Sequence, residues 1–226
     1  MKRLPLGVLV AVAAMALLIP SAASSGSGGT HHWLVTITNL TPPGPGPPGS
    51  QPLSPPLFVV HSNRADVWSV GEIATHPVAA IAEDANNGPA VSAYADLPGV
   101  REVFTGAGGP IPSGVSRSYM VETSGHFDRL SVVTMLVNTN DAFTGLDSFH
   151  VHGHGTTRET MAYDAGSESN NEQLAYIPGP CCGHPFVRDP EGALIGMHEG
   201  ITGRGDLDPA VYGWTGPVAR IQISRG

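Results

Sequence analysis

The sequence predicts an all-β protein, an antiparallel β-sandwich with one or two short helices. Several short segments are rich in β-branched and aromatic residues, and in most of them apolar and polar residues alternate, as in strands that bury one face. Turn-forming stretches separate these segments, and the 226-residue chain contains 29 glycines and 21 prolines. Many short strands joined by turn-rich loops are typical of sandwiches.

In the first half of the chain, the alternating segment 32–38 predicts the first strand. Residues 41–56 are rich in Pro and Gly, and because prolines cannot donate hydrogen bonds to a ladder, this segment is expected to form a surface loop within the domain. The short apolar segment 57–60 predicts a buried strand. Residues 66–86 have apolar residues at helical spacing, interrupted by Pro77, and predict two short helices on the sheet edge.

The second half repeats the strand pattern. Residues 106–114 form a predicted Gly/Pro loop, and residues 116–123 alternate as a strand does. Residues 130–137 are almost entirely apolar, which favours a central strand buried on both faces. Residues 217–224 alternate again and are the predicted last strand.

The start of the chain resembles a secretory signal peptide. Lys2 and Arg3 precede an apolar run over 4–19, and small residues follow at 21–24. We therefore expect cleavage after Ala23, a flexible segment over 24–30, and one domain over 31–226. The protein is expected to be secreted, with no transmembrane segment in the mature chain.

The charge balance excludes some function classes. The formal net charge is −8, and Lys2 is the only lysine. An acidic chain without basic clusters argues against nucleic-acid binding, and the secreted form has no lysine for Schiff-base chemistry. An acidic surface suits cation binding, although it also serves solubility.

Two turns carry carboxylates directly after predicted strands, in Met135–Asp147 and Tyr163–Glu168. Calcium takes six to eight oxygen ligands from carboxylates, carbonyls and water, and loops at the end of a sandwich can bring such ligands together. These turns therefore predict a calcium site. In the alternative interpretation, the acids cap turns by accepting hydrogen bonds from backbone N–H groups.

Four segments in order resemble the spondin domain, which occurs in F-spondin, in mindin and in many secreted bacterial proteins: Gln51–His61, Met135–Asp147, Tyr163–Glu168 and Pro217–Ile221. The resemblance spans residues 32–225. It implies a calcium-binding β-sandwich similar to C2 domains, which serves extracellular adhesion and recognition of an unknown protein or glycan, without known catalysis. The calcium-binding acids of the family match Asp141, Asp164 and Glu168, the last replacing the usual aspartate.

Histidines suggest an alternative function. His150, His152 and His154 alternate, so in a strand their imidazoles would share one face and could bind zinc or copper. The protein would then be a secreted transition-metal-binding protein or a metal-dependent hydrolase. They could equally belong to an exposed polar edge. Because the chain contains neither a Gly-x-Ser-x-Gly nor a His-Glu-x-x-His motif, we predict that it is not an enzyme.

Cys181 and Cys182 are the only cysteines, and they are adjacent. In an oxidising compartment they are expected to form a vicinal disulfide. Two alternatives remain from the sequence: thiolates that bind a soft metal together with His184, or thiols that are buried or pair between molecules.

Overall fold

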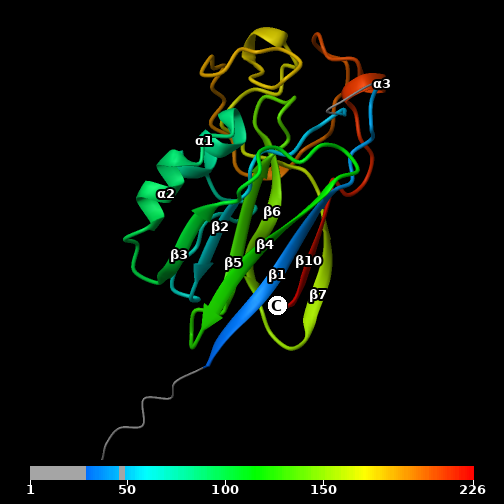
Figure 1. Cartoon of the computed structure of the whole chain (residues 1–226). Coiled ribbons are helices and arrows are strands. Elements are labelled where there is room, and N and C mark those ends of the chain that lie inside the picture. Colours follow the sequence, from blue (N-terminus) through cyan, green and yellow to red (C-terminus); the bar gives the residue numbers. More distant parts are fainter. Residues whose placement is uncertain (1–28, 46–48) are drawn as a thin grey trace, which may run out of the picture.

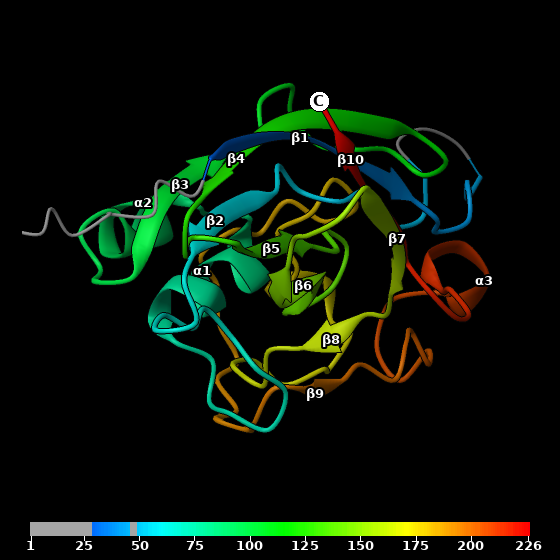
Figure 2. The same cartoon turned by 90° about the horizontal axis from the view of Figure 1, so that it is seen from below.

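The protein is a sandwich of two antiparallel β-sheets (Figure 1), as the sequence predicts. A computed structural model of the chain describes residues 29–45 and 49–226, so the predicted signal peptide lies outside the described residues. Figure 2 shows the sheets as two layers. None of the helices in the described residues is long and apolar enough to cross a membrane.

The smaller sheet has four strands, in the order β4 (Ser116–Ser124), β1 (Thr30–Asn39), β10 (Ala219–Arg225) and β7 (Gly155–Thr160). Alternate residues of β1, namely Trp33, Val35 and Ile37, are buried, which is the consequence of the period of two in a strand. Trp33 also donates a hydrogen bond from Nε1 to Oγ1 of Thr123 on β4, at 2.8 Å.

The larger sheet has six strands, in the order β3 (Val100–Thr105), β2 (Leu57–His61), β5 (Arg129–Met135), β6 (Ala142–His150), β8 (Tyr163–Asp164) and β9 (Gly196–Met197). All of β2 and all but the first residue of β5 are buried, which confirms the predictions of a buried strand at 57–60 and of a central strand in 130–137. Strand β6 needs glycine at 145, because a Cβ there would lie 1.8 Å from the carbonyl oxygen of Val132.

Two apolar cores hold these layers together. One lies between the sheets and includes Trp33, Phe58 and Ile221. The other lies on the opposite face of the larger sheet, where α1 (His76–Asp84) and α2 (Gly88–Tyr94) cover Leu57 and Phe143 (Figure 2). Burial on both faces explains why the central strands contain continuous apolar runs instead of an alternating pattern.

The predicted positions of the helices are partly wrong. Residues 66–75 form turns, bends and an isolated bridge at Ile73, and both helices begin later, at His76 and at Gly88. Pro77 starts α1 instead of separating two helices, since the first turn of a helix does not use its backbone N–H groups. The structure also contains the short helices η1 (Leu174–Tyr176) and α3 (Pro209–Tyr212).

The two ends of the sandwich differ. At the upper end in Figure 1, the turn between β5 and β6 lies under long loops formed by residues 165–195 and 198–215. At the lower end lie the turn between β4 and β5, the turn between β6 and β7, and the end of β10. The predicted calcium-binding acids belong to the upper end, and the alternating histidines belong to the lower end.

Candidate functional site

Asp141 lies at the bottom of the upper loop cluster, between β5 and β6. Thr139 shapes the turn that precedes it, accepting a hydrogen bond from the N–H of Ala142 at 3.0 Å and donating one to the carbonyl of Leu136 at 2.6 Å. Oδ2 of Asp141 accepts hydrogen bonds from the backbone N–H of Ser167 at 2.8 Å and of Glu168 at 2.9 Å. Oδ1 is buried and has no hydrogen-bond donor among the described residues.

Asp164 is the last residue of β8 and a neighbour of Asp141, because β8 pairs with the start of β6 in the register Ala142 to Asp164. Its Oδ1 accepts a hydrogen bond from the N–H of Gly166 at 2.7 Å, and its Oδ2 accepts one from Nδ2 of Asn170 at 2.6 Å. The turn needs Gly166, which has a φ of 65° and no room for a Cβ against Ala193. Asp164 therefore has the turn-capping role that the sequence left as an alternative.

Glu168 is fully buried, and neither of its carboxylate oxygens has a hydrogen-bond donor in the described part of the chain. Its Oε1 lies 3.3 Å from Nε of Arg188 in an ion pair. Arg188 also pairs with Glu83, at 2.5 Å, and with Asp84, both in the last turn of α1. The guanidinium of Arg188 therefore forms ion pairs with three carboxylates.

Glu83, Asp84 and Arg188 were missed by the sequence reasoning. A weak signal was available, because acidic residues in the last turn of a helix oppose the helix dipole. Two carboxylates at such a place indicate that a cation lies nearby, and here Arg188 supplies one positive charge. The partner, more than a hundred residues further along the chain, could not be identified from spacing.

The pKa values reflect this crowding of acids. Burial raises the pKa of Asp141 from 3.8 to about 7, and the charge of Asp164 adds to the rise, while hydrogen bonds from Glu168 and Ser167 oppose it. Burial also raises the pKa of Glu168 from 4.5 to about 8, although the charge of Arg188 opposes the shift. Near neutral pH Asp141 is therefore partly protonated and Glu168 mostly protonated, and a cation could displace these protons.

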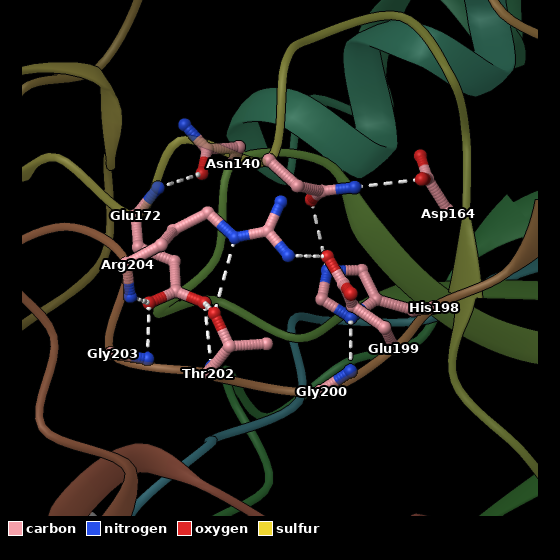
Figure 3. Close-up of polar contacts among 10 residues, drawn as sticks. Asn140, Asp164, Glu172, His198, Glu199, Gly200, Thr202, Gly203 and Arg204 are labelled. Atoms are coloured by element: carbon pink, nitrogen blue, oxygen red, sulfur yellow. Dashed lines mark hydrogen bonds and ion pairs between the residues drawn. The ribbon is translucent and has the colours of Figure 1, made fainter.

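A second polar network adjoins Asp164 (Figure 3). The side-chain oxygen of Asn170 is 2.9 Å from Nε2 of His198, and the N–H of Gly200 donates to Nδ1 of the same ring at 3.0 Å. His198 therefore carries its proton on Nε2 and donates it to Asn170. Burial lowers the pKa of His198, although the charge of Asp164 opposes the shift, so the ring is neutral at neutral pH.

Glu172 ties the loop at 202–204 to this network (Figure 3). Its carboxylate accepts hydrogen bonds from the N–H groups of Thr202 at 2.6 Å, Gly203 at 2.7 Å and Arg204 at 2.9 Å, and from the hydroxyl of Thr202 at 2.8 Å. Burial alone would raise the pKa of Glu172, but these hydrogen bonds outweigh it and lower the pKa. Glu172 is thus a structural anchor for this loop.

The predicted calcium ligands are brought together in part. Asp141 and Asp164 are neighbours across the β6–β8 pairing, and the backbone of Glu168 binds Asp141, whereas the side chain of Glu168 pairs with Arg188. Among residues 29–45 and 49–226, no three His, Cys, Asp or Glu side chains are grouped so that they could hold a metal ion. The oxygen atoms without donors, on Asp141 and Glu168, are nevertheless of the chemical type that calcium binds.

His150, His152 and His154 do not lie in one strand, so the prediction that their imidazoles share one face of a strand is wrong. Strand β6 ends at His150, residues 151–154 form the turn, and β7 begins at Gly155 in the other sheet. The chain passes from the larger to the smaller sheet between β6 and β7. Side chains alternate between two faces only within a strand, so these residues have no common face.

Cys181 and Cys182 form the vicinal disulfide that the sequence predicts. The backbone N–H of Cys181 donates to Oδ1 of Asn138 at 3.1 Å, so the disulfide loop packs beside the turn that carries Asp141.

Comparison with known proteins adds no family to these observations. A scan against models of known protein families finds no match, and no curated protein matches the chain.

Proposed function

We propose that this protein is a secreted, calcium-binding recognition or adhesion module, in which the ion orders the loops at the upper end of the sandwich. One observation carries the calcium proposal. Oδ1 of Asp141 and both side-chain oxygens of Glu168 are buried without a hydrogen-bond donor in the described residues. Asp141, Asp164 and Glu168 would hold the ion.

A buried carboxylate without donors is unfavourable, so it either takes up a proton or acquires a cation. Arg188 contributes a single positive charge against Glu168, Glu83 and Asp84, and Asp141 lies close enough to Glu168 to raise its pKa further. A divalent ion would balance the excess negative charge. Oxygen-only ligands favour a hard cation such as calcium over zinc or copper.

Ordering of loops is the expected consequence of calcium binding. Asp141 accepts hydrogen bonds from Ser167 and Glu168, and Asp164 accepts one from Asn170, so the acids connect the β5–β6 turn to the loop at 165–172. An ion bound here would stabilise the folded state by mass action. The ordered loop surface would then contact a partner, which we expect to be an extracellular protein or glycan because of the spondin resemblance and the predicted signal peptide.

Calcium titration of the EDTA-treated protein tests this proposal, with the melting temperature as the readout and magnesium and zinc as comparison ions. We expect a calcium-selective rise in the wild type, no rise in Asp141→Asn, and a normal rise in Asp96→Asn, which removes an exposed acid. A wild-type melting temperature that stays constant up to millimolar calcium would refute the proposal.

A further inference from the structure

A cavity of about 240 Å³ lies at the lower end of the sandwich, opposite the proposed calcium site. Its lining combines polar side chains from four parts of the chain: His31 on β1, Asp128 in the turn before β5, His150 and His152 around the end of β6, and Arg225 on β10. Among the described residues that line this cavity, His150 and His152 are present and His154 is not.

Hydrogen bonds determine which nitrogen of each ring carries a proton. Nε2 of His150 is 3.0 Å from Oδ2 of Asp128, and Nδ1 of His152 is 2.9 Å from the carbonyl oxygen of His150. Both partners are acceptors, so both of these nitrogens carry hydrogen. In the neutral rings, lone pairs are therefore left on Nδ1 of His150 and on Nε2 of His152.

This arrangement is the one that metal-binding histidines generally have. The nitrogen that does not bind the metal donates to a carboxylate or a backbone carbonyl, which orients the ring and makes the other nitrogen a better ligand. The rings of His150 and His152 also lie next to each other, with centroids 4.7 Å apart and planes inclined by 32°. Two nitrogen ligands thus lie at the end of β6 and in the turn that follows it.

His31 does not act as a third ligand in this arrangement. Nη1 of Arg225 donates to Nδ1 of His31 at 2.8 Å, which leaves the proton of the neutral ring on Nε2. The guanidinium of Arg225 is in turn held 4.4 Å above the ring of Trp33. The positive charge of Arg225 disfavours a cation in the cavity, and the carboxylate of Asp128 opposes this effect.

We propose that Nδ1 of His150 and Nε2 of His152 bind a borderline divalent transition metal, with copper preferred over zinc, and that Asp128 positions His150. Imidazole nitrogen suits these metals, and the affinity of a given site is highest for Cu²⁺. Two protein ligands leave coordination positions open to water. This site is independent of the calcium site, since it lies at the other end of the molecule and uses nitrogen ligands.

Titration of the purified protein with CuCl₂, followed by visible absorption and by electron paramagnetic resonance, tests the assignment. We expect nitrogen hyperfine structure from two imidazoles in the wild type and at least a tenfold loss of affinity in His152→Ala. The matched control is His154→Ala, which removes an exposed histidine from the same turn and should leave the affinity unchanged. Melting temperatures verify that both variants are folded.

Asp128→Asn separates positioning from binding. Its affinity for Cu²⁺ should fall by about tenfold to a hundredfold while the two-nitrogen spectrum persists, because the ligands remain and only the charged hydrogen-bond acceptor that orients His150 is lost. An equal loss of affinity in His154→Ala and His152→Ala would overturn the proposal, since it would indicate binding by the histidine-rich turn as a whole. Unchanged affinity in His152→Ala would overturn it as well.

Discussion

Replacement of Glu168 by glutamine should stabilise the calcium-free protein at alkaline pH, which is an unusual result for a fully buried side chain. In the folded protein Glu168 keeps its proton up to a pKa of about 8, whereas its ordinary pKa is 4.5. The unfolded chain therefore binds fewer protons than the folded protein between these values. Because of this difference, the stability contributed by Glu168 falls as the pH rises from about 4.5 to about 8.

The magnitude follows from the size of the shift. The rise of the pKa of Glu168 from 4.5 to about 8 corresponds to on the order of 5 kcal/mol of stability, of which about 3 kcal/mol is lost by pH 7. Glutamine has nearly the same shape and cannot ionise, so Glu168→Gln removes this loss. Arg188 keeps its contacts with Glu83 and Asp84 in the variant.

Urea denaturation at pH 5 and pH 8 measures the effect, in EDTA and in calcium. We expect the wild type in EDTA to be less stable at pH 8 than at pH 5, and Glu168→Gln to depend less on pH. Calcium should restore the wild type at pH 8 and should have little effect on the variant. Glu159→Gln is the control, since it changes an exposed glutamate.

Lower stability of Glu168→Gln than of wild type, at pH 8 in EDTA, would refute the reasoning. Such a result would mean that the ion pair with Arg188 outweighs the cost of burying the carboxylate. The proposal that Glu168 lacks a sufficient counter-charge would then fail, and with it the main argument for a cation at this site.

Three further results are expected. Calcium binding at pH 7 should release protons from Asp141 and Glu168, the two buried carboxylates with a raised pKa. Calorimetry in buffers of different ionisation enthalpy measures this release, and equal binding heats in all buffers would contradict it. Glu172→Gln should destabilise the protein by about 2–4 kcal/mol in urea denaturation, because hydrogen bonds to a charged acceptor are lost. Gly145→Ala should lower the free energy of unfolding by more than about 2 kcal/mol, because its Cβ would collide with the facing strand β5. Gly196→Ala is the control, because a Cβ at that position meets no close contact.

The sheets were largely predictable because their pattern is local. Alternation over 32–38 and over 116–123 identified β1 and β4, and the continuous apolar run over 130–137 identified β5 as a central strand. The helices were placed less well. Spacing over 66–75 is compatible with a helix, but the structure forms turns there, since helical periodicity alone does not show which segment has a sheet face to cover.

The acids of the candidate site were predictable only in part. Asp141 lies in the turn after β5 and Asp164 ends β8, and both were identified by their place beside predicted turns, together with the family resemblance. The surroundings of Glu168 depend on α1 and on Arg188, which lie far from it in the sequence. Neither its complete burial nor the shortage of positive charge around it has a signature in the local pattern.

The sequence by itself determined the fold class and the faces of the strands, because a spacing of two residues directly encodes which side chains share a face. The tertiary structure decided which carboxylates are buried and which histidine rings lie next to each other. Desolvation and charge pairing arise from contacts between distant segments. Burial thus raises the pKa of Glu168 although Arg188 opposes the rise, and His150 and His152 line the cavity whereas His154 does not.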